Sequence, residues 1–409
     1  MNTLLIFSWQ HLWSMKNGSG APSYHHTIQY YINSPDWDVY LFTADETNEN
    51  LELDEEHLFL YKAPKLIEKG MKVKRVSFFC KRLRHNGFTK WAFSKAKKIL
   101  NSSSHCYVYG YEVWGVKVAQ QLANKYNIPL ITRFQGTILC AQKDNFINRL
   151  RTYPHYEALS TPADLIVMTD DGTFGKDVLQ ELGNRSKCLF VRNGLDLYEH
   201  YEEYRNNADS TLVRKKLDIE EDCKIIMMAS RLASWKRLDR GIVAIKEVVK
   251  EYKNVILLIA GDGDERENLK KLSTELGISS HVKFLGSVPH KELYEYMLAA
   301  DLFMSLYDIG NLGNPTFEAM LMGRAIIALN NGDTASLLHH DENAFLLSPD
   351  SIETLPRIII KLLRDEGLRK RLADQAYQDA VDKFYTWETR MKMEEENIIN
   401  IGGVRVPTC

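Results

Sequence analysis

Two cations follow the end of an apolar run near the middle of the chain. In SRLASWKRLDRG, residues 230–241, Arg231 and Lys236 stand five positions apart across a predicted turn. Side chains placed in this way can point into one cleft, where two fixed positive charges would balance a diphosphate and stabilise it as a leaving group. The alternative interpretation of the same residues is a solvated, basic helix start.

A second stretch, YDIGNLGNPTFEAMLMG at 307–323, begins as loop and ends as helix. We expect Asn314 to be the N-cap, Pro315 the first helical residue and Gly323 the residue that closes the helix. The helix start would offer N–H groups and a positive dipole end to an anion. Glu318 stands one turn inside. The alternative interpretation is an ordinary tight connection with an exposed glutamate.

A third loop follows the first predicted strand. It is KNGSGAPSYHHTIQYY at 16–31, in which Gly18 and Gly20 permit a close backbone approach to a ligand. The pattern is not G-x-G-x-x-G, because Ser23 occupies the third glycine's place. An ordinary turn between a strand and a helix is the competing interpretation.

The elements that would position these loops are clearest in the C-terminal half. Short apolar runs there predict buried, parallel strands at 224–232, 255–261, 281–286, 301–306, 325–330 and 344–348. Charged segments of helical period lie between them, at 237–252, 265–276, 290–299, 314–322 and 334–340. Such alternation predicts a doubly wound α/β domain with its ligand loops at the carboxyl ends of the strands.

The N-terminal half repeats the theme. Its strand candidates are 3–9, 38–44, 107–110, 129–136, 163–169 and 188–194. The polar segment 195–222 is interpreted as a domain linker, and the tail 351–398 as helical.

Composition is that of a globular protein with two domains. The chain has 409 residues, 44% of them hydrophobic and 26% charged, and a net charge of −2 that does not favour nucleic acid. Its six cysteines form no C-x-x-C pair, which favours free thiols in a reducing compartment. The N-terminal apolar run has the character of a first buried strand rather than a signal peptide.

The C-terminal half resembles the donor domain of the GT-B-fold, retaining glycosyltransferases of glycosyltransferase family 4 (glycosyl transferases group 1). The resemblance rests on four runs in order over about 224–350: SRLASWKR, LIAGDGDERENLKKL, VKFLGSVPHKELYEYMLAADLFMSL and NLGNPTFEAMLMGRAIIALNNG. It implies an α/β protein of two Rossmann-like, doubly wound domains facing a cleft. These would be an acceptor-binding domain at 1–200, a donor-binding domain at 201–380 and a terminal helix at 381–409 returning towards the first domain.

The resemblance also implies a donor site. Arg231 and Lys236 would hold the diphosphate of a nucleotide sugar, and Glu318 would accept hydrogen bonds from the ribose hydroxyls. Other donor-binding residues would be Gly18, Gly20, Ser287, Val288, Asp308, Gly310, Asn311, Leu312, Gly313, Asn314 and Thr316.

Two departures from the family pattern concern the donor sugar. The family often carries a glutamate eight positions before Glu318, where this chain has Gly310, and Asp308 is a candidate substitute. Many members also have a His-Gly pair in the N-terminal domain, where this chain has Gln135 and Gly136 on the acceptor or sugar side. An amide can hydrogen-bond a sugar hydroxyl but is not a base at neutral pH.

The predicted function is retaining transfer of a hexose-type sugar from a UDP- or GDP-linked donor to a hydroxyl of a glycan or lipid-linked acceptor. Synthesis of cell-surface polysaccharide or glycoconjugate is the expected context. No cofactor and no metal is expected, since DWD at 36–38 and DGD at 262–264 are interpreted as a strand start and a glycine turn. The alternatives are a degenerate nucleotide-sugar-binding scaffold and a nucleotide-sugar 2-epimerase.

A basic stretch at 62–98 carries thirteen Lys or Arg against one acid, Glu68, a local balance of +12. Aromatic residues are interleaved with these cations. Such a surface suits an anionic membrane or an anionic acceptor. A solvated helical surface is the alternative, and nucleic acid is less favoured because no binding motif accompanies the charge. We therefore expect a cytoplasmic protein, peripheral on the inner face of the membrane.

Overall fold

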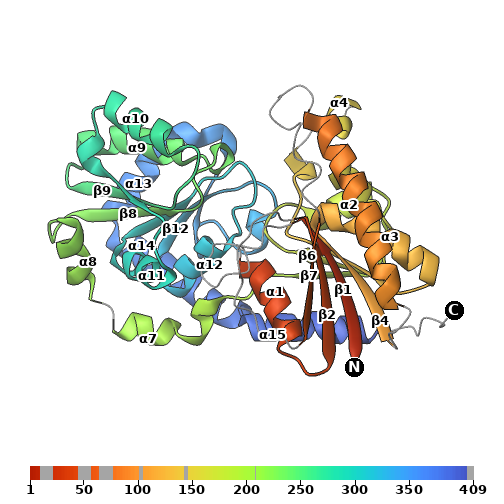
Figure 1. Ribbon diagram of the computed structural model, residues 1–409. Coiled ribbons are helices and arrows are strands. Elements are labelled where there is room, and N and C mark those ends of the chain that lie inside the picture. The colour runs from red at the N-terminus through yellow and green to blue at the C-terminus, as the bar shows by residue number, and fades with distance from the viewer. Residues whose placement is uncertain are drawn as a thin grey trace. The chain divides into compact units, whose positions relative to one another are not determined.

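The computed structural model describes residues 1–9, 22–44, 57–63, 77–100, 105–141, 146–207 and 209–402. The chain forms two compact units (Figure 1). Unit 1 comprises Met1–Asp170, Phe174–Asn193 and Trp387–Cys409, and unit 2 comprises Asp171–Thr173 and Gly194–Thr386.

Unit 1 is built on a seven-stranded parallel sheet of order β3-β2-β1-β4-β5-β6-β7. The strands are β1 (Asn2–Ser8), β2 (Trp37–Thr43), β3 (Leu58–Lys62), β4 (His105–Tyr111), β5 (Leu130–Phe134), β6 (Leu165–Thr169) and β7 (Cys188–Val191). Six of them were predicted. The strand β3 was not predicted, because this short edge strand is mostly exposed and lacks the continuous apolar run of its neighbours.

Helices cover both faces of this sheet. On one face α1 (Pro22–Ile32) and α15 (Trp387–Ile399) contribute to a common core, and on the other α2 (Ser77–Leu100) and α3 (Glu112–Tyr126) do so. The remaining helices are α4 (Phe146–Arg151), α5 (Tyr153–Leu159) and α6 (Gly175–Glu181).

Unit 2 is built on a six-stranded parallel sheet of order β10-β9-β8-β11-β12-β13. The strands are β8 (Lys224–Ala229), β9 (Val255–Ala260), β10 (Val282–Gly286), β11 (Leu302–Ser305), β12 (Ala325–Leu329) and β13 (Phe345–Leu347). Its helices are α7 (Tyr201–Asn206), α8 (Ser210–Leu217), α9 (Leu238–Glu251), α10 (Arg266–Glu275), α11 (His290–Ala299), α12 (Asn314–Leu321), α13 (Leu355–Arg364) and α14 (Glu366–Lys383). All six predicted strands are confirmed, and with them the prediction of two Rossmann-like α/β domains.

Two predictions for this unit are wrong. The expected helix at 334–340 is only a 3₁₀ turn, Thr334–Ser336. The expected linker at 195–222 contains α7 and α8 and belongs to unit 2. Tyr198, Tyr201 and Tyr204 of this segment pack against a hydrophobic cluster that includes residues of α11 and α12. The charged residues around these tyrosines obscure this apolar contact in the sequence.

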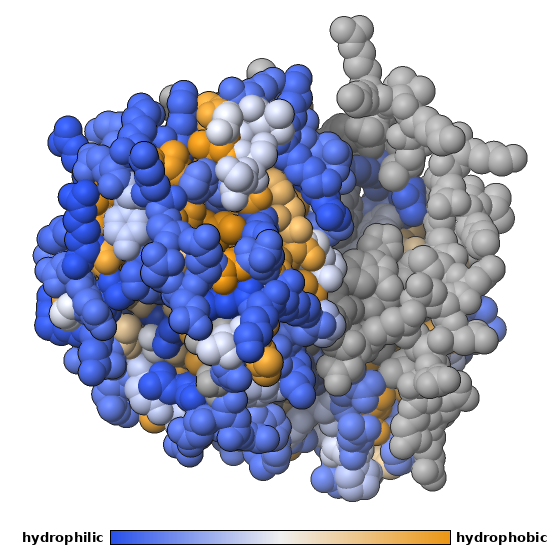
Figure 2. Space-filling model, turned by 90° about the vertical axis from the view of Figure 1, so that its left-hand side faces the viewer, coloured by the Kyte–Doolittle hydropathy of each residue, from blue (hydrophilic) through white to orange (hydrophobic). Residues whose placement is uncertain are grey.

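Among the coloured residues in Figure 2, hydrophilic ones predominate, with hydrophobic residues interspersed.

A buried ion network holds the C-terminal helix α15 in unit 1, where it lies beside α1 (Figure 1). The Glu394 carboxylate accepts from Arg133 Nη1 at 2.9 Å, from the Tyr109 hydroxyl at 2.6 Å and from Arg390. Burial opposes ionisation, but Arg390 and Arg133 prevail and lower the pKa of Glu394. The helix is therefore fixed by charge as well as by apolar packing.

Candidate functional site

Lys236 lies against two aromatic rings just beyond the carboxyl end of β8. Its Nζ atom is 3.7 Å from the centre of the Tyr307 ring and 4.1 Å from that of Trp235. Burial lowers the pKa of Lys236 to about 7; the charge of Asp171 opposes this shift and Arg231 adds to it. The Arg231 side chain is exposed. Lys236 is thus a poorly solvated cation that an incoming anion would stabilise.

A glycine turn after β9 packs against the loop that follows β8. A Cβ atom on Gly261, at φ +126°, would lie 1.9 Å from the Ser230 carbonyl oxygen, and one on Gly263 would lie 2.5 Å from that of Leu232. The Asp262 carboxylate accepts from the Gly263 N–H at 2.8 Å and pairs with an arginine of α10. Among the described residues, no group of three or more His, Cys, Asp and Glu side chains has the arrangement of a metal site.

Asn311 organises the loop between β11 and α12 from within. Its buried Oδ1 accepts from the Ser305 hydroxyl at 2.9 Å and the Tyr307 N–H at 3.0 Å. Its Nδ2 donates to the Tyr307 carbonyl at 3.1 Å and to Asn331, while the Thr316 hydroxyl donates to the Asn311 carbonyl at 2.9 Å. The side chains of Asn311 and Thr316, both predicted to bind the donor, are therefore used in shaping the loop.

Helix α12 begins one residue earlier than predicted. Gly313, at φ −102° and ψ 167°, is the N-cap, so Asn314 and Pro315 occupy the first two helical positions. Glycine is itself a favourable N-cap residue, but asparagine ranks above it, so the residue-type preference pointed to Asn314. The predicted end is confirmed: Gly323 has φ +63° and donates its N–H to the Met320 carbonyl at 2.8 Å.

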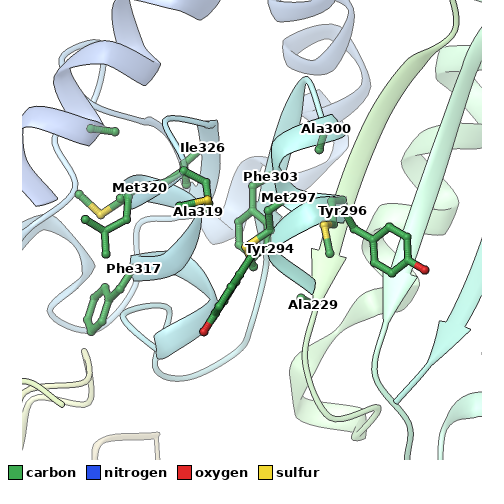
Figure 3. Packing of buried hydrophobic residues seen from close by; sticks show 14 of the residues in the cluster. Ala229, Tyr294, Tyr296, Met297, Ala300, Phe303, Phe317, Ala319, Met320 and Ile326 are labelled. Atoms are coloured by element: carbon green, nitrogen blue, oxygen red, sulfur yellow. The ribbon is translucent and has the colours of Figure 1, made fainter. Parts of the chain in front are cut away.

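Glu318 is buried in α12, only 5% exposed, so the alternative of an exposed glutamate is wrong. Burial raises the pKa of Glu318 to about 8, the charge of Asp196 raises it further, and Tyr294 opposes the shift. Figure 3 shows Tyr294 beside Phe303 and Met297, with its hydroxyl pointing away from those side chains. Burial thus favours the neutral form of this carboxyl.

Asp308 and Gly310, the two positions considered for contact with the donor sugar, differ in their surroundings. The Asp308 carboxylate pairs with Arg240 at 2.7 Å and Arg237 at 3.4 Å, which ties the loop to the start of α9. Gly310 has φ +70°, and a Cβ atom there would lie 3.3 Å from the Asp171 carbonyl oxygen. Asp171 was not among the predicted site residues. No local pattern indicates it, because Asp171 follows β6, far away in the sequence.

The other predicted donor-binding residues are spread out. Ser287 is exposed and Val288 half-buried beyond the end of β10, while Leu312 is buried in the core of unit 2. Gly18 and Gly20 lie outside the described residues.

Gln135 and Gly136 follow β5 in unit 1. The Gln135 N–H donates to Glu112 Oε1 at 2.8 Å, and its side-chain Nε2 donates to the Tyr111 hydroxyl at 3.1 Å and to Ser23. Gly136 turns the chain with φ +88°. Glu112 has φ +57°, an uncommon backbone for a glutamate, and the sequence offers no signal for it.

Known proteins are similar to this chain in sequence. Residues 209–379 match the family model described as "Glycosyl transferases group 1". Lipopolysaccharide core biosynthesis glycosyltransferase LpsE of Rhizobium meliloti is 29% identical over 42% of this chain, which spans about half (48%) of that relative's length. An uncharacterized glycosyltransferase of Methanocaldococcus jannaschii is 23% identical over 78% of this chain and 83% of its own.

Solved structures resemble the whole chain. Sucrose-phosphate synthase from Thermosynechococcus elongatus has a TM-score of 0.76 at 17% identity and covers 98% of this chain and 99% of its own. Anabaena HepE in complex with UDP-glucose has a TM-score of 0.71 at 18% identity, covering 96% and 99%. The structural likeness shows the fold, and the match at 209–379 lies within unit 2. The chain therefore has a GT-B fold, and residues 209–379 are similar to the group 1 glycosyl transferases.

Proposed function

We propose that this protein is a retaining glycosyltransferase that moves a hexose-type sugar from a nucleotide diphosphate sugar to a hydroxyl of a glycan or lipid-linked acceptor. One observation carries the proposal. Unit 2 presents Lys236 after β8 and buried Glu318 behind the start of α12, in a parallel sheet whose carboxyl edge is the usual ligand side.

The chemistry needs a stabilised leaving group. The bond between the anomeric carbon and the phosphate oxygen breaks, and the negative charge that develops on the diphosphate is met by Lys236, Arg231 and the N-terminus of α12. The acceptor oxygen bonds to the anomeric carbon from the same face, and its proton passes to the departing phosphate oxygen. No metal or cofactor takes part in this scheme, because the side-chain cations provide the compensating charge.

The names of similar proteins support nucleotide sugars as donors. HepE is described with UDP and with UDP-glucose, and one Corynebacterium glutamicum relative is named as GDP-mannose-dependent. We therefore propose a UDP- or GDP-linked hexose as the co-substrate. Relatives named for lipopolysaccharide core synthesis suit a glycan or lipid-linked acceptor in cell-surface synthesis.

A donor screen tests the proposal. Purified protein is incubated with UDP-glucose, UDP-galactose, UDP-N-acetylglucosamine and GDP-mannose, with and without lipid-linked glycans, and released nucleotide is measured. We expect acceptor-dependent release from one donor, unchanged by EDTA, and a product whose anomeric configuration by NMR matches the donor. Nucleotide binding without release from any donor would favour a scaffold, and release of a C2-epimerised sugar without an acceptor would favour an epimerase.

Helix α2 is the part of the basic stretch that we propose lies on an anionic membrane at the cytoplasmic side. Six of its cations are exposed, and Leu83 beside them is 66% exposed: Lys81, Arg82, Lys90, Lys95, Lys97 and Lys98. The preceding residues 64–76 lie outside the described part of the chain. No helix in the described part is long and apolar enough to cross a bilayer.

Vesicle flotation tests this surface. Lys90 and Lys97 lie two turns apart on α2, and each cation near an anionic surface contributes about 1 kcal/mol. Reversing both to Glu should release the protein from phosphatidylserine-containing vesicles. The same change at Lys270 and Lys271, on α10 of unit 2, should leave flotation unchanged. Equal loss with both pairs would indicate a general charge effect and contradict a role for α2.

A further inference from the structure

A three-residue segment after β6, Asp171–Thr173, belongs to unit 2 although the residues on both sides belong to unit 1. The segment packs on two loops of unit 2. A Cβ atom on Gly172, at φ +84°, would lie 3.4 Å from Leu312 Cγ, and the Gly172 carbonyl accepts from the Asp333 N–H at 3.2 Å. A Cβ atom on Gly332 would lie 1.9 Å from the same carbonyl oxygen. Glycine at 332 therefore lets the segment lie directly on the loop after β12.

This packing brings the Asp171 side chain to the loop between β11 and α12. A Cβ atom on Gly310 would lie 3.3 Å from the Asp171 carbonyl oxygen and 4.0 Å from its Oδ2. The Thr173 hydroxyl donates to Asp171 Oδ1 at 2.6 Å and orients the carboxylate. The side chain is partly exposed, and its charge acts on Lys236. A carboxylate thus lies beside Gly310 and within electrostatic reach of the proposed diphosphate lysine.

Asp308 is a poorer candidate for the same role. Its carboxylate is shared between Arg237 and Arg240, so binding a sugar hydroxyl would require breaking two ion pairs. The Asp171 carboxylate accepts a hydrogen bond from the Thr173 hydroxyl and is partly exposed.

We propose that Asp171 is the carboxylate that binds the hydroxyls of the donor sugar and thereby selects it. A carboxylate accepts hydrogen bonds from two sugar hydroxyls and distinguishes epimers that present them differently. This inference rests on the proposed function, because it presumes a nucleotide sugar in the site of unit 2.

The test compares binding of nucleotide sugars with binding of the nucleotide alone. Calorimetry gives Kd for UDP, UDP-glucose, UDP-galactose, GDP and GDP-mannose with the wild type, Asp171→Asn and Thr173→Val. Asp170→Asn is the matched control, because Asp170 is the neighbouring residue and pairs with Arg192 in unit 1. Circular dichroism melting of each variant reports whether it is folded.

We expect Asp171→Asn to keep the Kd for the bare nucleotide within about threefold and to weaken the preferred nucleotide sugar at least tenfold, with discrimination between the epimers UDP-glucose and UDP-galactose reduced. Thr173→Val should show a smaller loss of the same kind, and it replaces the first variant if that variant does not fold. Asp170→Asn should match the wild type. An unchanged ratio of sugar-nucleotide to nucleotide affinity in both site variants would overturn the inference and leave the proposed function intact. Failure of the wild type to bind any nucleotide would instead reject the proposed function.

Discussion

The ammonium group of Lys236 lies 3.7 Å from the centre of the Tyr307 ring, and the Tyr307 hydroxyl donates to the Ala229 carbonyl at the end of β8 at 2.9 Å. The ring is therefore fixed to the sheet, and it holds the lysine where water solvates it poorly. This relationship converts a flexible side chain into a positioned cation whose charge depends on what binds beside it.

Replacing Lys236 by Met should remove most of the leaving-group stabilisation. We expect kcat/KM for sugar transfer to fall roughly 100-fold or more, as it does when a preorganised group at a developing anion is lost. Lys250→Met, at an exposed lysine of α9 that pairs with Glu247, is the control and should be neutral. Transfer at the wild-type rate by Lys236→Met would refute the assignment.

Nucleotide binding should move protons in opposite directions at two residues. A diphosphate raises the pKa of Lys236 from about 7, so binding takes up protons above that pH. Ribose hydroxyls favour the Glu318 carboxylate and lower its pKa from about 8, so binding releases protons below that pH.

Calorimetry at pH 7.5 in buffers of different ionisation enthalpy separates proton uptake at Lys236 from proton release at Glu318. Glu318→Gln should show net proton uptake and an affinity that falls as pH rises from 6.5 to 8.5, whereas Lys236→Met should show net release. Identical proton counts in both variants would show that neither group contacts the nucleotide.

The Tyr307 ring and its hydroxyl should be separable by mutation. Tyr307→Phe loses one hydrogen bond, which costs about 1 kcal/mol of unfolding free energy, and should bind nucleotide nearly as the wild type does. Tyr307→Leu also loses the cation–π contact, which contributes about 0.5–2 kcal/mol. We therefore expect this variant to bind nucleotide several-fold more weakly than the wild type. Equal affinities of the two variants would mean that the ring does not position Lys236.

Two glycines allow a matched test of how the Asp171–Thr173 segment packs. Gly277 and Gly332 have φ +71° and φ +56°, but a Cβ atom on Gly277 meets nothing within 4 Å, whereas one on Gly332 would lie 1.9 Å from the Gly172 carbonyl oxygen. Gly277→Ala should cost about 1–2 kcal/mol from backbone strain alone. Gly332→Ala should lower the melting temperature further and also weaken nucleotide-sugar binding. Equal effects of both on binding would contradict the packing described.

The Glu394 network should make the stability of unit 1 depend on pH. The folded state lowers the pKa of Glu394, so its stabilisation is full above the unfolded value of 4.5 and is lost as pH falls towards the folded value. Glu394→Ala leaves two buried guanidiniums uncompensated and should cost about 3–5 kcal/mol.

Glu394→Gln should flatten the acid limb of a urea-unfolding profile followed by tryptophan fluorescence. Glu396→Gln, at an exposed site on the same helix, should leave that profile unchanged. An unaltered acid limb in Glu394→Gln would show that the network does not titrate in this range.

The strands could be predicted because buried parallel strands need apolar runs, and six such runs stand between charged segments in each half. The edge strand β3 and the helices α7 and α8 escaped prediction, since an edge strand is partly solvated and the anchoring tyrosines of α7 sit among charges. Local rules also placed the end of α12 correctly, whereas its start was predicted one residue too late because asparagine ranks above glycine as an N-cap.

The sequence by itself determined the alternation of strands and helices and the family resemblance, and it predicted the loops that we propose to bind a diphosphate. These depend on residues close together in the chain, where periodicity, glycines and caps act locally. Only the tertiary structure decided that Glu318 is buried and that the Lys236 ammonium lies over the Tyr307 ring. The same holds for the pairing of Asp308 with two arginines and for the position of Asp171 beside Gly310. Burial, pKa and charge pairing arise from neighbours distant in the chain, which come together only in the folded unit.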